Sequence, residues 1–172
     1  MPLLRRSAIT ATAAGAALGL FAAPALAGLK PIYVTGPTYA HDTSFATAKT
    51  QVLVTGTNKS TTVRLYVSGL PSSAVGKTLG AHVHANACGP QPADSGPHYQ
   101  NPNALPGTPL HNKEIWLDLK VRQSGHAAAK ARVPWTIAKG AAGSVVVHAN
   151  PTNHHTGDAG GRLLCTTVPF GS

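Results

Sequence analysis

Glycine and proline interrupt this chain so often that little of it can form a helix. Its 172 residues include 18 glycines and 14 prolines. From residue 28 onward, no apolar pattern at helical spacing runs long enough to stabilise a helix, and the alanines at 127–129 are too few to nucleate one. The segments between the interruptions are short and rich in residues that favour strands. The sequence therefore predicts an all-β protein.

Eight short strand-forming segments are separated by turn residues. In the clearest of them, Val63, Leu65 and Val67 alternate with polar or amphipathic residues, so one face should be buried and the other wet. About eight such strands joined by Gly- and Pro-rich turns predict a sandwich or a barrel. The expected strands are 31–35, 51–55, 61–67, 79–84, 115–121, 129–137, 144–148 and 163–168.

The first 27 residues have the composition of a secretory signal. Arg5 and Arg6 precede an apolar and small-residue stretch, and Ala25-Leu26-Ala27 has the A-x-A form of a cleavage site. The alternative, a membrane anchor, is disfavoured because the stretch is short and alanine-rich. The two arginines fit either the general or the twin-arginine export route. We therefore expect a signal peptide at 1–27, a single β domain at 28–172, no membrane span, and a final location in the periplasm, the cell envelope or the medium.

The two cysteines, Cys88 and Cys165, are the only ones in the chain. Disulfides persist outside the cytoplasm, so we expect an exported chain to pair them. The alternative is a pair of unbonded, buried thiols.

The chain is also basic. Once Arg5 and Arg6 leave with the signal, 12 Lys and Arg remain against 5 Asp and Glu. This charge favours anionic partners, which include small anionic substrates, acidic polymers of the cell envelope and nucleic acid. Because export makes nucleic acid the least natural of these, we expect none, and we expect at most a weak association with envelope polymers. The alternative is that the charge only keeps the protein soluble.

Four of the nine histidines stand in settings that suit a metal ion. His82 and His84 are two apart on an expected strand, so their imidazoles point to the same face. His98 lies in 85–112, a segment without periodicity that is long for a loop, and long loops in compact domains are usually functional. His148 ends an apolar run. Singly, each is as well explained by a surface or hydrogen-bonded position, but together they would form an all-imidazole site that suits copper or zinc.

Several of these residues belong to four separated motifs. In order along the chain the motifs are Gly80-Ala81-His82-Val83-His84, Gly96-Pro97-His98, Val146-Val147-His148 and Gly157-Asp158-Ala159-Gly160-Gly161-Arg162-Leu163-Leu164-Cys165. They resemble the signatures of the copper/zinc superoxide dismutase family, and the match runs from about residue 61 to the C-terminus. The resemblance implies a Greek-key antiparallel β-barrel that converts superoxide to hydrogen peroxide and dioxygen by one-electron redox cycling of copper.

The resemblance also assigns roles to individual residues. It makes Arg162 the arginine that guides superoxide, for which a structural role is the alternative. It makes Cys88 and Cys165 the family's disulfide, which ties the metal-bearing loop to the barrel. His98 is the ligand that bridges to zinc where zinc exists. The copper ligands that it implies are His82, His84, His98 and His148.

The sequence departs from the zinc-containing pattern after His98. Pro106 stands where a further zinc ligand is expected, which leaves His111 and Glu114 and a site one ligand short. The segment 149–161 is short and almost uncharged, whereas zinc-containing members carry a longer charged loop. Both differences resemble the copper-only branch of the family, in which a glutamate hydrogen-bonds the bridging histidine. We expect copper without zinc and Glu114 in that role; the alternatives are an ordinary surface carboxylate and a zinc site that includes His111.

Two other functions stay open. A copper-binding or buffering protein of the same fold would lack turnover, but carriers of reduced copper favour thioether and thiolate ligands, and Met1 is the only methionine. A basic structural domain of the envelope would leave the four motifs unexplained. The sequence gives no expectation for the oligomeric state. The remaining histidines, His41, His126, His154 and His155, are expected at the surface, with accessory metal binding by the last two as an alternative.

Overall fold

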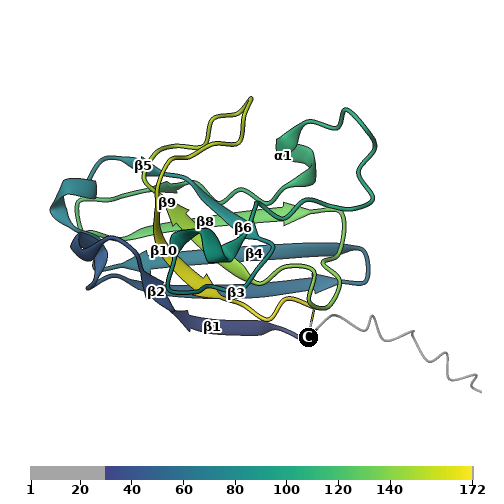
Figure 1. The fold of residues 1–172 in the computed structure, drawn as a ribbon. Coiled ribbons are helices and arrows are strands. Elements are labelled where there is room, and N and C mark those ends of the chain that lie inside the picture. Colours follow the sequence, from purple (N-terminus) through teal and green to yellow (C-terminus); the bar gives the residue numbers. More distant parts are fainter. Residues whose placement is uncertain (1–29, 172) are drawn as a thin grey trace, which may run out of the picture.

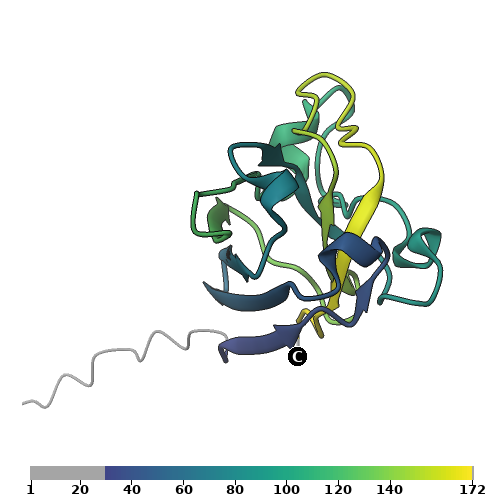
Figure 2. The same ribbon diagram turned by 90° about the vertical axis from the view of Figure 1, so that its left-hand side faces the viewer.

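Two four-stranded antiparallel sheets enclose one hydrophobic core in the computed structural model, which describes residues 30–171 (Figures 1 and 2). One sheet consists, in spatial order, of β1 (Ile32–Gly36), β3 (Lys49–Thr57), β4 (Ser60–Ser68) and β8 (Ala127–Val133). The other consists of β2 (Tyr39–Ala40), β10 (Arg162–Thr167), β9 (Ser144–His148) and β6 (Ala81–His84). The short elements are β5 (Thr78–Leu79), which pairs with β7 (Leu119–Lys120), the 3-10 helices η1 (Thr43–Phe45), η2 (Ser72–Ala74) and η3 (Pro92–Ser95), and the α-helix α1 (Leu110–Lys113).

The expected all-β class is confirmed, and so is the alternation in the clearest strand. In β4, Val63, Leu65 and Val67 are at most 2% exposed, whereas Tyr66 between them is 48% exposed. The alanines that begin β8 form strand rather than helix, because β8 pairs with β4 along the whole length of β8. Within residues 30–171, the four residues of α1 are the only α-helix.

Three expected strands are shorter, shifted or broken. In place of 129–137, the strand β8 begins two residues earlier and ends at Val133. The segment 79–84 divides at Gly80 because the residues on its two sides pair in different sheets, Leu79 with β7 and those of β6 with β9. The segment 115–121 is a strand only in β7, although the Leu117 N–H still donates to a carbonyl of β6 at 2.7 Å. The strand β2 and the short helices, including η3 and α1 in the long loop, were not expected.

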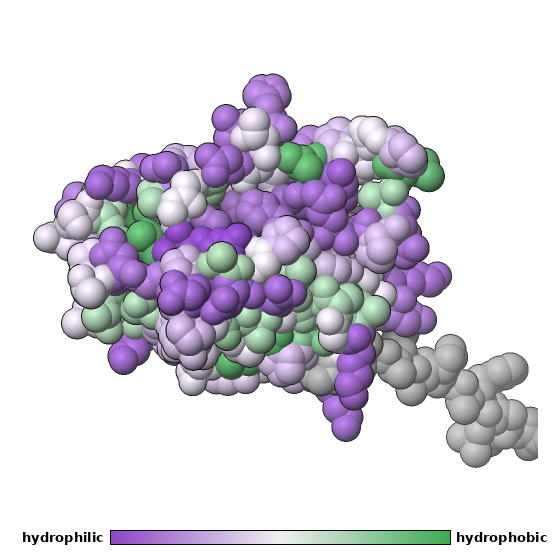
Figure 3. Space-filling view, viewed as in Figure 1, coloured by the Kyte–Doolittle hydropathy of each residue, from purple (hydrophilic) through white to green (hydrophobic). Residues whose placement is uncertain are grey.

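Two loops project on the same side of the sandwich. One runs from β6 to α1 and the other joins β9 to β10; the tip of the second and the part of the first that leads into α1 both project at the top of Figure 1. The projecting tip is hydrophilic (Figure 3). The first loop is tied to β10 by a disulfide between Cys88 and Cys165. The expected pairing of the cysteines is therefore confirmed.

The disulfide is typical of a protein that works outside the cytoplasm. The expected signal peptide at 1–27 lies outside the described residues, so it stays a prediction, as does the domain boundary at residue 28. None of the helices among residues 30–171 is both long enough and apolar enough to span a bilayer.

Candidate metal centre

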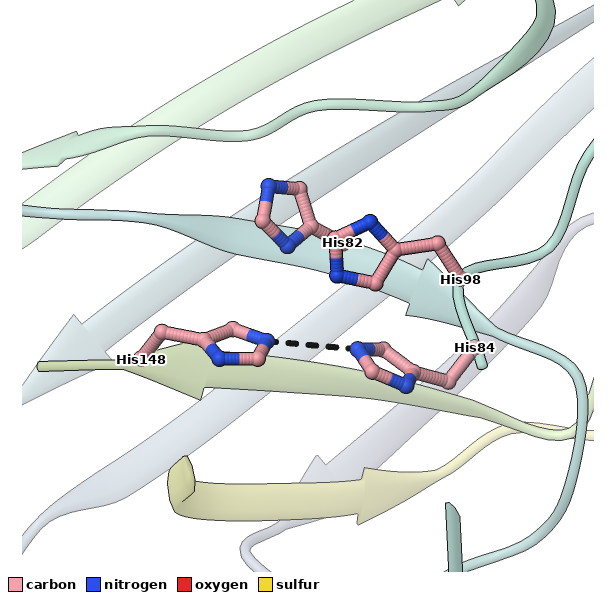
Figure 4. Close-up of side chains that lie close together, drawn as sticks. All are labelled: His82, His84, His98 and His148. Carbon is pink, nitrogen blue, oxygen red and sulfur yellow. Dashed lines mark hydrogen bonds between the residues drawn. The ribbon is translucent and has the colours of Figure 1, made fainter. Parts of the chain in front are cut away.

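Four histidines from three segments meet beside β6 and β9 (Figure 4). Two come from β6, one from the end of β9, and one from the loop after β6. One side-chain nitrogen of each lies within 4.8 Å of those of the other three. Within residues 30–171, no other group of three or more His, Cys, Asp or Glu is arranged to hold one ion. The group contains all four histidines singled out in the sequence, namely His82, His84, His98 and His148.

Backbone pairing places these side chains. β6 and β9 are antiparallel neighbours, and the N–H of His148 donates to Gly80 just before β6, at 2.7 Å. His82 and His84 are two apart on β6, so the pleat directs both to the same face. His98 pairs with His84 in an isolated antiparallel bridge. The ligand-bearing loop is therefore positioned by sheet hydrogen bonding as well as by the disulfide.

Two of the imidazoles are held through Nδ1. The Nδ1 atoms of His84 and His148 donate to the carbonyls of Gly96 and Gly160, each at 3.0 Å. A carbonyl can only accept, so in the neutral rings the proton sits on Nδ1 and the lone pair on Nε2. The two Nε2 atoms are 3.2 Å apart. Lone pairs at that distance repel unless a proton or a cation lies between them, which suits a metal-binding position.

His82 is held the other way round. Its Nε2 lies 2.8 Å from the hydroxyl of Thr152, and that hydroxyl donates to the carboxylate of Asp118. Because the hydroxyl uses its only hydrogen on Asp118, it accepts from His82, whose Nδ1 keeps the lone pair. That Nδ1 is buried and has no hydrogen-bond partner. An unpartnered buried nitrogen is unfavourable on its own, but it fits a metal ligand.

Glu114 holds the fourth histidine. Its buried carboxylate accepts hydrogen bonds from His98 Nδ1 at 2.9 Å, Trp116 Nε1 at 2.8 Å and Gln100 Nε2 at 2.8 Å. Burial by itself would raise the pKa of Glu114, but the three hydrogen bonds together bring that pKa below its ordinary value. The carboxylate is therefore charged at neutral pH. With Nδ1 of His98 donating to it, Nε2 of His98 is left for the cluster.

Burial keeps three of the imidazoles neutral. It lowers the pKa of His82 to about 2, of His84 to about 3 and of His148 to about 4, with further lowering by the charges of neighbouring imidazoles. The hydrogen bonds to Gly96 and Gly160 oppose the shifts of the second and third only in part. Neutral imidazole is the form that binds metal ions, so the three rings are ready to do so at physiological pH.

These lowered pKa values predict that the metal-free protein loses stability in mild acid. Unfolded histidine titrates near pH 6.5, so below that pH the unfolded chain gains protons that the buried imidazoles do not, and the free energy of unfolding falls. We expect a loss of up to about 1.4 kcal/mol per pH unit for each of the three histidines between pH ~6.5 and ~4. Thermal melts of metal-free protein across this range measure it. His126→Gln, which removes an exposed histidine, should leave the slope unchanged; a melting temperature that does not change with pH would contradict the neutral-imidazole assignment.

Arg162 begins β10 and pairs with the last residue of β9, so it lies next to the cluster. Its guanidinium donates to Pro92 O at 2.7 Å, Ser95 Oγ at 2.8 Å and Gly96 O at 2.8 Å. The Gly96 carbonyl also accepts from His84, so one atom orients both side chains. A guanidinium has five N–H donors, and with three used within residues 30–171 two are left for a small anion. Partial burial lowers the pKa of Arg162, but the group stays charged at neutral pH.

Of the two residues expected behind the copper ligands, the structure brings only Glu114 to the cluster. His111 is exposed, and its ring lies edge-on to Trp116 with centroids 6.3 Å apart. The sequence reasoning missed Trp116, Asp118 and Thr152. A signal was present for the first two, because Glu114, Trp116 and Asp118 alternate with the buried apolar residues of the 115–121 segment. They therefore share one side of an extended chain.

Most of the chain matches a known family. The sequence model of the family described as copper/zinc superoxide dismutase (SODC) matches residues 48–168. This span contains the four clustered histidines, the arginine and both cysteines. A comparison with curated proteins finds no match for the chain.

Proposed function

Because the chain belongs to the copper/zinc superoxide dismutase family, we propose that it is an exported superoxide dismutase that depends on copper. The reaction takes two superoxide anions and two protons to one hydrogen peroxide and one dioxygen, since one superoxide loses the electron that the other gains. The observation that carries the proposal is the buried cluster of imidazoles with their lone pairs turned to one another. The proposed ligand atoms are Nδ1 of His82 and Nε2 of His84, His98 and His148.

The residues fit copper in three respects. An all-imidazole set binds copper in both oxidation states, so the site would survive the change of charge. The unpartnered Nδ1 of His82 and the close Nε2 atoms of His84 and His148 are both relieved by a shared cation. When bound there, copper would supply a centre that accepts and returns one electron.

The chain's own residues attract the superoxide anion and hold the four imidazole rings in a fixed orientation. The guanidinium of Arg162 is held next to the cluster by three hydrogen bonds, and its two N–H donors that have no partner within residues 30–171 are available to a small anion. Hydrogen bonds that the rings donate to backbone carbonyls, to Glu114 and to the hydroxyl of Thr152 keep each ring in one tautomer and orientation, as outer partners do for other metal-bound histidines. The loop between β9 and β10 covers part of this arrangement, because a Cβ on Gly157 would lie 3.6 Å from a carboxylate oxygen of Glu114.

The proposal is tested by following superoxide decay with copper-loaded protein beside His148→Ala. A dismutase consumes superoxide in many turnovers per chain, and the variant should not. A copper-buffering protein would bind copper with no turnover. The disulfide argues against a carrier of reduced copper, because it removes both thiolates that such a carrier would use.

Replacing the guanidinium should lower catalytic efficiency without removing the metal. We expect Arg162→Ala to keep its copper and to lose about tenfold or more in kcat/KM at low ionic strength, since the attraction for superoxide is lost while the ligands remain. The salt dependence of the rate should also weaken. Lys139→Ala, which removes an exposed cation elsewhere, is the control. Equal efficiency of Arg162→Ala and wild type at matched copper content would return this arginine to a structural role.

The proposed metal content does not include zinc. We propose that the protein acts with copper alone. The carboxylate of Glu114 stands beside Nδ1 of His98, on the side of the ring that zinc occupies in zinc-containing relatives. It already accepts three hydrogen bonds, which a metal ion would have to displace. In this proposal the carboxylate orients the histidine in place of zinc.

Removing this carboxylate should therefore impair the site selectively. Glu114→Ala is expected to keep copper but to lose about 10- to 100-fold in activity, the range found when outer partners of metal ligands are removed. Activity and copper content measured on the same samples check this. His111→Ala is the matched control and should stay active. Full activity in Glu114→Ala at equal copper content would make this glutamate a structural residue.

A further inference from the structure

The outer face of the first sheet carries a row of cations on β4 and β8. Arg64 of β4 lies directly opposite Lys130 of β8. Two residues further along β8, Arg132 lies opposite Thr62 of β4. These positions alternate with the buried residues of both strands, so their side chains point away from the core. Like charges placed directly opposite each other destabilise a sheet. The pair of Arg64 and Lys130 is thus kept against a local cost to folding.

Two hollows extend this row at the ends of the strands. At one end, a hollow of about 470 Å³ is lined by Lys49, Arg122 and Tyr66. At the other end, a hollow of about 290 Å³ is lined by Lys59 and Arg132. Since β4 has nine residues, the two hollows are separated by roughly the 30 Å that nine strand residues span. We call the three central cations and the two hollows the basic face.

No acidic residue balances this charge. The strands β1, β3, β4 and β8 contain no Asp or Glu, and within residues 30–171 the only ion pair joins His98 to Glu114. The acidic residues lie instead in the turns and loops around the second sheet and the metal centre. They are Asp42, Asp94, Glu114, Asp118 and Asp158. The first sheet therefore carries cations without any acidic residue among its own strands, which a role in solubility alone does not require.

We propose that the basic face binds a linear acidic polysaccharide outside the cell. A row of cations that runs the length of β4 matches a polymer with regularly spaced anionic groups. Tyr66 and Tyr33, which are 48% and 61% exposed on the same sheet, offer aromatic faces against which sugar rings can pack. A second copy of the chain would bring like charges together. The disulfide favours a location outside the cytoplasm, where nucleic acid is scarce. The proposal does not depend on the metal centre, and it would hold the protein at a polysaccharide-rich surface.

The test measures the affinity of the full chain for dextran sulfate over a series of salt concentrations, with uncharged dextran as the reference polymer. The variant carries Arg64→Gln, Lys130→Gln and Arg132→Gln. Its affinity at low salt should fall about tenfold or more, and the slope of log Kd against log salt should fall by about three, one for each charge removed. Wild type should bind uncharged dextran far more weakly than dextran sulfate.

The matched control carries Lys77→Gln, Lys113→Gln and Lys139→Gln, which gives the same net charge but leaves the basic face intact. It should bind nearly as wild type does. Equal weakening by both triple variants would show that only net charge matters and would overturn the proposal. Tighter binding of an oligothymidylate than of dextran sulfate would make the surface a nucleic-acid site and would also overturn it.

A second measurement uses the wild-type chain, so it does not depend on how the variants fold. Lysines are acetylated with and without dextran sulfate, and the modified positions are identified. Lys49 and Lys130 should be protected, whereas Lys77 and Lys139 should react equally in both samples. Protection spread evenly over all four lysines would contradict the proposal.

Discussion

A His82→Ala, His84→Ala double variant is expected to lose its copper and its superoxide dismutase activity. Removing the two strand imidazoles takes away half of the proposed donor set. Loss of a single outer partner already weakens metal sites by about 10- to 100-fold, so we expect loss of two ligands to exceed ~100-fold. Copper content, the optical spectrum of the bound metal and the rate of superoxide decay are measured on the same preparation.

The matched control for this variant is His154→Ala, His155→Ala, which removes two exposed histidines from the loop between β9 and β10. It should keep the copper, the spectrum and the activity. A thermal melt shows whether each variant is folded before its metal content is compared. The site assignment fails if the double variant of the strand keeps the native copper stoichiometry and spectrum.

Breaking the disulfide should have the largest effect on stability. The bond between Cys88 and Cys165 closes a span of 77 positions, so Cys88→Ser, Cys165→Ser should lower the free energy of unfolding by about 4–5 kcal/mol on the chain-entropy model. For a chain of this size that corresponds to a fall in melting temperature of roughly 10–20 °C. Activity should fall as well, because the loop after β6 carries the carbonyls of Pro92 and Gly96 that fix Arg162.

Thermal melts with and without reductant check this prediction. Reductant should lower the melting temperature of the wild type toward that of the variant, and it should leave the variant unchanged. If the variant and the wild type have the same melting temperature under oxidising conditions, the disulfide has no stabilising role and the loop is held by its other contacts.

The fold class followed from local patterns, because strand alternation is a property of neighbouring residues. Val63, Leu65 and Val67 needed only the period of two to be placed in the core. The break at Gly80 could not be found in this way, because it depends on pairing of the residues on its two sides with different strands, β7 and β9, which lie far away in the sequence. The presence of most strands therefore followed from sequence, whereas their bounds and interruptions depended on tertiary contacts.

The candidate site shows the same division. The four histidines could be selected from strand spacing and from resemblance to a family. The nitrogen of each ring that faces the cluster could not be predicted from the sequence, because it depends on hydrogen-bond partners that the fold supplies. Thr152 fixes the tautomer of His82 from 70 positions away and is itself held by Asp118. Glu114 was found as a partner of His98, but the donors from Gln100 and Trp116 that keep it charged were not.

We propose above that this chain is a superoxide dismutase that needs copper and no zinc, and one measurement tests this most directly. The measurement is metal content by elemental analysis alongside the rate of superoxide decay, before and after zinc is added to copper-loaded protein. We expect one copper per chain, full activity without zinc, and no gain when zinc is added. One tightly held zinc per chain, with activity appearing only once it binds, would overturn the proposal and make His111 and Glu114 zinc ligands.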